Sequence, residues 1–125
     1  MSGWTLFGAI SMFLSVALGA FGAHGLKGTI SDYSLAVYET GVHYQMIHGL
    51  AILLVAVLMG QWNTSSSLLG AANWAFLIGT FLFSGSLYLL AITGVRALGA
   101  ITPFGGIAFL TGWFLLAWAA WKTRS

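Results

Sequence analysis

Two histidines, a glutamine and several hydroxyl groups lie in stretches of the chain that are otherwise apolar. His24 ends the first such stretch, and His48 lies early in the second. Imidazole titrates near neutral pH and binds metals, so a pair of histidines could carry protons or hold an ion. The full set of candidate site residues is His24, Tyr44, Gln45, His48, Ser84, Ser86 and Tyr88.

Three interpretations fit this set, and the first is preferred. In a structural hydrogen-bond network, a neutral imidazole donates to one partner and accepts from another. In a ligand, ion or proton site, His24 and His48 would titrate within a path. In a metal or haem site, Met46 could join the histidines. Because the chain has no closely spaced histidine pair and no set of carboxylates, we predict neither a metal nor a cofactor.

The residues of a hydrolytic enzyme are not assembled in this sequence. Serines and histidines are present, but no acidic residue lies among the apolar stretches to orient a base. The absence of cysteine excludes a thiol nucleophile and disulfides. We therefore predict that the protein is not an enzyme.

Composition restricts the class of protein. Of 125 residues, 59% are hydrophobic and only 5% are charged, whereas soluble domains carry about 25% charged residues. The mean hydropathy is +0.95. These values exclude a soluble enzyme, a nucleic-acid binder and a disordered chain. They predict an integral membrane protein whose immediate partner is the lipid bilayer.

The six charged residues divide the chain into long uncharged segments, namely residues 1–26, 40–95 and 97–121. A helix needs about 20 apolar residues to cross the hydrocarbon core. The middle segment has room for two crossings, because the polar run at residues 61–67 interrupts it. The sequence thus predicts one domain, residues 1–125, with four spans. Their approximate bounds are 4–23, 42–60, 68–93 and 103–121.

The segment between the first two spans is the longest connection. Gly25 and Gly28 favour a break there, and Ser31 or Asp32 is suited to cap a new helix. We expect a short interfacial helix that runs into the second span. Pro103 is suited to the first turn of the fourth. The first span has no basic residue before it, so we interpret it as retained rather than as a cleaved signal peptide.

Four crossings place both termini on one side. Five of the six tryptophans fall toward that side, and the four tyrosines toward the other. Both residue types favour membrane interfaces, so two belts are expected, with Trp113 deeper. Lys122 and Arg124 favour cytoplasmic termini in the cell (inner) membrane.

Small residues indicate how the helices pack. Ser11, Ser15, Gly19 and Ala23 recur every four residues along the first span. Membrane helices associate through close contact at such small residues, either within one chain or between copies. The sequence therefore also favours a homo-oligomer or a larger membrane complex. The remaining packing candidates are Gly22, Gly85, Gly105, Gly106 and Gly112.

Four motifs resemble those of a known family. They are LGAFGAH at 18–24, YQMIHGLA at 44–51, LFSGSLY at 82–88, and TPFGG at 102–106 followed by GW at 112–113. In this order they resemble the DUF423 family of small four-helix membrane proteins, which includes transmembrane-protein-256-like members. The resemblance implies the four-helix fold and emphasises the seven polar candidates. It implies no particular activity.

Two functional hypotheses follow. The preferred one is a structural or accessory membrane protein whose His/Tyr/Gln/Ser cluster holds the bundle together. The alternative is a small oligomeric transporter or channel with a proton- or ligand-binding site at His24 and His48. A metal- or haem-binding protein is a further alternative.

Overall fold

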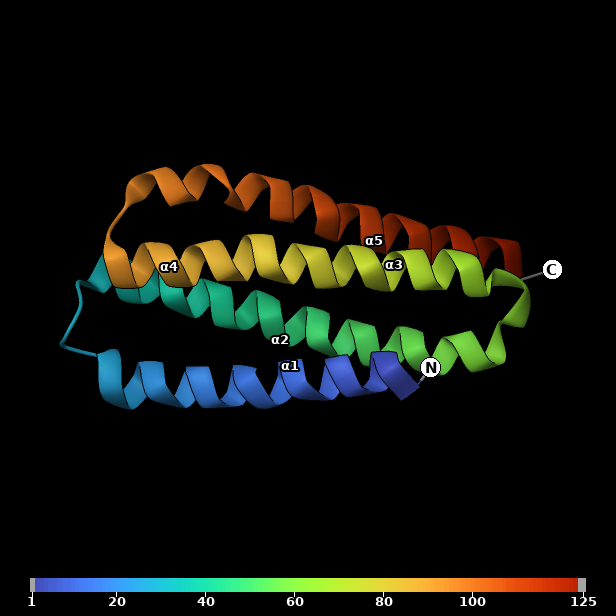
Figure 1. The fold of residues 1–125 in the computed structure, drawn as a ribbon, viewed down its shortest axis with the longest axis horizontal. Coiled ribbons are helices and arrows are strands. Elements are labelled where there is room, and N and C mark those ends of the chain that lie inside the picture. Colours follow the sequence, from blue (N-terminus) through green and yellow to red (C-terminus); the bar gives the residue numbers. More distant parts are fainter. Residues whose placement is uncertain (1, 124–125) are drawn as a thin grey trace.

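The chain folds into an antiparallel bundle in which α1 begins and α5 ends at the same end of the molecule (Figure 1). The computed structural model describes residues 2–123. Within them, four helical segments are long and apolar enough to cross a membrane. These are Gly3–Leu26, Asp32–Gln61, Asn63–Thr93 and Arg96–Thr123. The predicted fold class, an all-α membrane bundle of four spans with its ends on one side, is confirmed.

Each span has its own local structure. The first consists of α1 (Ser2–Phe21) and the wide π-helical turn η1 (Gly22–Leu26), and the second is α2 (Asp32–Gln61). The third joins the short turn η2 (Asn63–Ser65), α3 (Ser66–Gly79), the π-helical turn η3 (Thr80–Ser84) and α4 (Gly85–Thr93). The fourth joins η4 (Arg96–Ala100) and α5 (Thr102–Thr123).

The start of α2 differs from the prediction. The Ser31 hydroxyl caps the helix by accepting a hydrogen bond from the Ser34 backbone N–H at 3.0 Å. From Asp32 the helix then continues unbroken to Gln61, so no separate interfacial helix forms. No proline interrupts this stretch, and Gly41 packs inside the bundle against Tyr88 instead of breaking the helix. Thirty residues rise about 45 Å, so the first turns extend past a core of about 30 Å.

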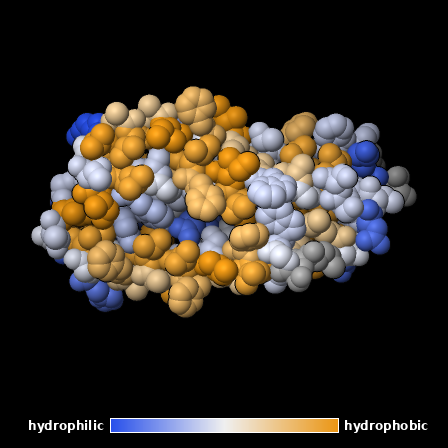
Figure 2. All heavy atoms as spheres, viewed as in Figure 1, coloured by the Kyte–Doolittle hydropathy of each residue, from blue (hydrophilic) through white to orange (hydrophobic). Residues whose placement is uncertain are grey.

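The spans divide into two inner and two outer helices. The second and third spans are the more enclosed. Within the most apolar 18-residue stretch of each span, 44% of residues are buried in the second and 39% in the third, against 17% in the first and the fourth. Helix α1 packs mainly on α2, and α5 packs mainly on α3 and η3. Figure 2 shows apolar residues over the middle of the molecule and hydrophilic residues toward both ends. This distribution matches a bundle whose apolar band faces lipid.

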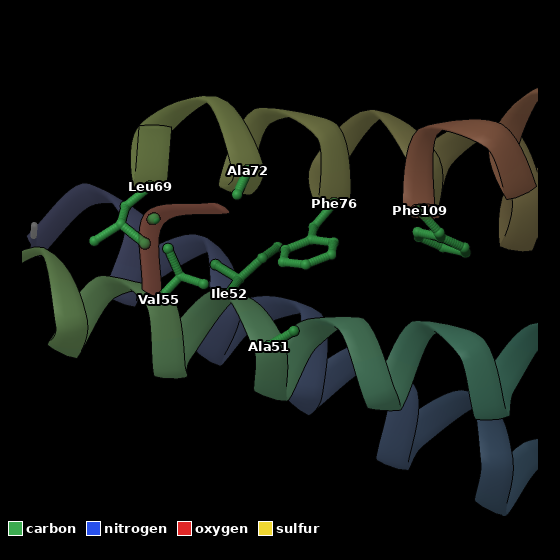
Figure 3. Close-up of a cluster of buried hydrophobic side chains, with 8 residues drawn as sticks. Ala51, Ile52, Val55, Leu69, Ala72, Phe76 and Phe109 are labelled. Carbon is green, nitrogen blue, oxygen red and sulfur yellow. The ribbon is translucent and has the colours of Figure 1, made fainter. Parts of the chain in front are cut away.

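The main apolar core lies between α2 and α3. Ile52 and Val55 of α2 face Leu69, Ala72 and Phe76 of α3 (Figure 3). Ile52, Val55 and Phe76 are at most 1% exposed. This core fixes the two inner helices, on which the outer helices then pack.

The small residues of α1 pack within the chain. Ser15 is fully buried, and a Cβ atom added to Gly8 would lie 2.8 Å from the Leu53 side chain of α2. A Cβ atom on Gly22 would lie 2.6 Å from Tyr38. Ala23, however, is exposed. The ridge of small residues thus faces α2 along α1, whereas Ala23, in η1, makes no such contact within the chain and its packing role between copies stays a prediction.

The glycines of the last two spans separate into two kinds. A Cβ atom on Gly105 would lie 2.4 Å from the backbone nitrogen of Phe83, and one on Gly112 would lie 2.5 Å from Phe76. Nothing lies within 4 Å of the corresponding position at Gly85 or Gly106. Gly105 and Gly112 are therefore packing positions within the chain, whereas a packing role for Gly85 and Gly106 between copies stays a prediction. Successive helical residues point about 100° apart, so only one of Gly105 and Gly106 can face η3.

Candidate functional site

His48 is held by hydrogen bonds at both ring nitrogens. Its side chain is 3% exposed. Nδ1 lies 2.7 Å from the Tyr44 carbonyl oxygen, and Nε2 lies 3.0 Å from the indole nitrogen of Trp113. An indole N–H only donates, so Nε2 must be the acceptor and Nδ1 must carry the proton. The contacts therefore select one neutral tautomer and use both of its polar atoms.

Aromatic rings enclose this imidazole. The Phe109 ring stacks on it, with 3.6 Å between centroids and 7° between planes. The Tyr44 ring is nearly parallel to it, at 6.1 Å and 9°. Phe76 and Trp113 approach from other directions at 5.5 Å and 5.7 Å. His48 thus joins α2 to α3 and α5 inside an aromatic cluster.

Gln45 forms a second connection, on another face of α2. Its side chain is 5% exposed. The amide nitrogen donates to the Ser11 carbonyl oxygen at 3.1 Å, and the amide oxygen accepts from the Tyr88 hydroxyl at 2.5 Å. One side chain therefore links α1, α2 and α4.

Hydroxyl groups of the third span form further links. Ser84, at the end of η3, donates to the Gly41 carbonyl oxygen of α2 at 2.7 Å. Ser86 lies 2.6 Å from the Thr102 hydroxyl at the start of α5. The wide turn η3 ends at Ser84 and stands directly before the helix that carries Ser86. Such a turn inserts one residue into the helix and so rotates the face that follows it. Here the end of η3 presents Ser84 to α2, and the segment after η3 presents Ser86 to α5.

His24 does not join these groups. It lies in η1, beyond the end of α1, and its side chain is exposed. Its imidazole makes no hydrogen bond with any of residues 2–123, and the span it ends packs mainly on α2, whereas His48 bonds to Trp113 of α5. The expected meeting of His24 with His48 is absent because Gly22 and Leu26 are the residues of η1 that face the bundle, whereas His24 lies on the exposed side of this turn. In the same range, no three His, Asp or Glu side chains come together as metal ligands.

The sequence missed several polar residues of the interior. Tyr38, expected in an interfacial belt, is 2% exposed and donates to the Leu18 carbonyl oxygen at 2.5 Å. Asn73 is fully buried and donates to the Ile52 carbonyl oxygen at 3.2 Å. One feature of the sequence pointed to Trp113, the partner of His48. It is the single tryptophan that falls outside the expected interfacial belt.

Comparison with known proteins agrees with this architecture. A family model described as "Protein of unknown function (DUF423)" matches residues 18–106. The UPF0382 membrane protein YwdK of Bacillus subtilis is 47% identical over 122 residues, covering 98% of each chain. The UPF0382 membrane protein SH2409 of Staphylococcus haemolyticus is 46% identical over 117 residues, covering 94% of this chain and 93% of its own. No solved structure matches the chain. The resemblance seen in the motifs is confirmed, and the chain belongs to the DUF423 family of membrane proteins.

Proposed function

We propose that this protein is a non-enzymatic structural or accessory protein of the cell membrane, whose interior polar side chains fasten its helices together. The observation that carries the proposal is the set of partners to which these side chains hydrogen-bond. Each of five predicted site residues bonds to another helical element of the chain, which leaves no reactive pair. These residues are Gln45, His48, Ser84, Ser86 and Tyr88.

The outer helices provide the surfaces for this role. Helices α1 and α5 carry large exposed apolar side chains, among them Phe13 on α1 and Leu110 on α5. A protein that works through such faces contacts a second copy or a larger membrane complex, as the sequence predicts. The hydrogen bonds inside the bundle hold the exposed faces of α1 and α5 in fixed positions relative to each other.

The transport alternative requires a path past His24 and His48. The two side chains lie in separate environments, one exposed in η1 and one enclosed by aromatic rings. His48 would also have to release Trp113 or the Tyr44 carbonyl in order to bind a further proton or ligand. The geometry therefore favours the structural role.

His48→Phe tests the two functions against each other. Phenylalanine retains the ring that stacks on Phe109 but loses both hydrogen bonds, so we expect the free energy of unfolding to fall by about 1–2 kcal/mol. Stability is measured by unfolding in mixed micelles, and ion or proton flux in liposomes. Exposed His43, five residues earlier on α2, supplies the control His43→Phe, which should leave stability unchanged. A pH-dependent flux in the wild type that His48→Phe abolishes would contradict the structural role.

The proposed orientation has both termini in the cytoplasm. The chain contains no cysteine, so a single introduced thiol reports one position. Ala97→Cys lies in η4, at the end of the bundle away from the termini, and Asn63→Cys lies in η2, at the terminal end; both residues are exposed. In intact cells, a membrane-impermeant maleimide should label Ala97→Cys and leave Asn63→Cys unlabelled until the cells are lysed. The reverse pattern would place the termini outside.

A further inference from the structure

A groove lies between α1 and α2, in the half of the bundle away from the termini. Its volume is about 220 Å³. Gly19 of α1 forms one wall, and one stripe of α2 forms the other. The residues of that stripe are Tyr38, Glu39, Val42, His43 and Met46. A helix is about 10 Å wide, so a groove of this size admits a small chemical group and not another helix.

The groove changes from polar to apolar along α2. Glu39 lies at its outer end, and Met46 lies further along the helix by a rise of about 10 Å. Helix α2 is followed by the polar turn η2. A hydrocarbon core of about 30 Å, measured from that end of α2, reaches back over about 20 residues to Val42. The groove therefore crosses the boundary between the lipid head groups and the acyl chains.

Glu39 brings a carboxylate without a partner to this boundary. It forms no ion pair with any other of residues 2–123. Arg96, at the same end of the bundle, is placed over the Tyr33 ring instead, 5.0 Å from its centroid. Ionised side chains near the hydrocarbon are rare and are usually paired. A carboxylate only accepts hydrogen bonds, so the missing partner of Glu39 is a donor, and a cationic donor bonds most strongly.

Two features of the groove restrict which cation fits. A metal ion would find a single carboxylate, because no three His, Asp or Glu side chains gather as metal ligands within residues 2–123. The apolar part of the groove, at Val42 and Met46, calls for a ligand that is cationic at one end and apolar at the other. A lipid with an ammonium head group has this order along the membrane normal. A primary ammonium has N–H donors for the carboxylate, whereas a quaternary ammonium has none.

We propose that the groove between α1 and α2 binds a lipid with a primary ammonium head group, the chemistry of phosphatidylethanolamine. The ammonium donates to the Glu39 carboxylate, and the first part of an acyl chain packs along Val42 and Met46. The proposal adds a lipid to the structural role above and does not depend on it, since the groove and the interhelical hydrogen bonds can be altered separately.

Two variants alter this site in different ways, and each has a matched control. Glu39→Gln removes the charge and keeps the size of the side chain. Asp32→Asn makes the same kind of change at the other acidic residue, which is exposed and does not line the groove. Gly19→Leu fills the groove, since a Cβ atom there would lie 3.5 Å from the Val42 side chain, an ordinary contact distance. Its control is Gly106→Leu, at an open position beside a separate groove between α2, η3 and α5.

The experiment is native mass spectrometry of the whole chain, released from detergent after titration with dioleoyl-phosphatidylethanolamine or dioleoyl-phosphatidylcholine. The two lipids differ only in the methyl groups on the nitrogen. We expect the first phosphatidylethanolamine to bind about 3- to 10-fold more tightly than phosphatidylcholine, the effect of a hydrogen bond to a charged group. Glu39→Gln and Gly19→Leu should remove this preference. Asp32→Asn and Gly106→Leu should retain it.

Equal affinity for the two lipids in the wild type would overturn the site, and so would an unchanged preference in Glu39→Gln or Gly19→Leu. Glycerophosphoethanolamine, the head group without acyl chains, serves as competitor, and displacement of the lipid at equal concentration would refute a lipid as the ligand. A dimer that Glu39→Gln abolishes would assign the carboxylate to a cation of a second copy and would refute the lipid as well.

Circular dichroism verifies that each variant is folded. If Gly19→Leu prevents folding, Glu39→Gln decides the outcome, because Glu39 is exposed and its replacement leaves the packing unchanged. The unfolding of His48→Phe and of its control His43→Phe is measured in micelles free of phosphatidylethanolamine. The two proposals therefore fail separately.

Discussion

Gly105→Leu is expected to lower the free energy of unfolding by about 3 kcal/mol or more, the largest effect of any single change considered. Already at Cβ, the new side chain would lie 2.4 Å from the backbone nitrogen of Phe83. A backbone atom within a helix cannot move aside as the end of a flexible side chain can. Helix α5 would have to separate from η3, with loss of the contacts around Phe109.

The neighbouring glycine supplies the control for this prediction. Gly106→Leu adds the same side chain one position later, where no atom lies within 4 Å of Cβ. It also removes a glycine from a helix, which favours folding by up to about 1 kcal/mol. Unfolding in mixed micelles, followed by circular dichroism, should find Gly106→Leu as stable as the wild type or more so. Equal losses in the two variants would contradict the close packing of α5 on η3.

Gln45→Leu is expected to cost about 2–3 kcal/mol. It removes both hydrogen bonds of the amide and leaves the Tyr88 hydroxyl and the Ser11 carbonyl oxygen without that partner. Single interhelical hydrogen bonds in membranes contribute about 0.6 kcal/mol on average and up to about 1.7. The unpaired Tyr88 hydroxyl adds a desolvation cost.

A double-mutant cycle isolates the central bond of this network. Tyr88→Phe removes only the hydroxyl, and the double variant with Gln45→Leu removes both partners. The cycle should give a coupling energy of about 0.5–1.5 kcal/mol, measured by the same unfolding assay. Strictly additive losses would show that the Gln45–Tyr88 contact contributes nothing to the joining of α2 and α4.

Several polar residues share one hydrogen-bonding pattern. Gln45, Ser84 and Tyr38 each donate to a carbonyl oxygen of a neighbouring helix, at Ser11, Gly41 and Leu18. In lipid, apolar side chains gain little by leaving the hydrocarbon, so helices rely on close packing and on such bonds. In the proposed structural role, the glycines let the helices approach and the polar side chains fix the register of one helix against the next.

The arrangement of the spans could be read from the sequence, whereas most partners of the polar residues could not. The gaps between charges give the number of crossings, because a charge in lipid is costly wherever it falls. Ser31 was likewise predictable as a cap, since capping depends on neighbours in the chain. The partner of His48, in contrast, is 65 residues away at Trp113. No local pattern specifies that distance.

The sequence by itself determined that this is a membrane protein with four spans, with its ends on one side and with polar side chains inside. Length and hydropathy decide those properties, because the bilayer acts on each segment separately. Only the tertiary structure decided which polar groups meet: it separated His24 from His48 and joined His48 to Trp113. It also distinguished Gly105, packed on η3, from Gly106, which is open to a groove. The physical reason is that helix rotation, altered by the wide turns η1 and η3, selects the neighbours of each side chain, and rotation depends on the packing of all four spans.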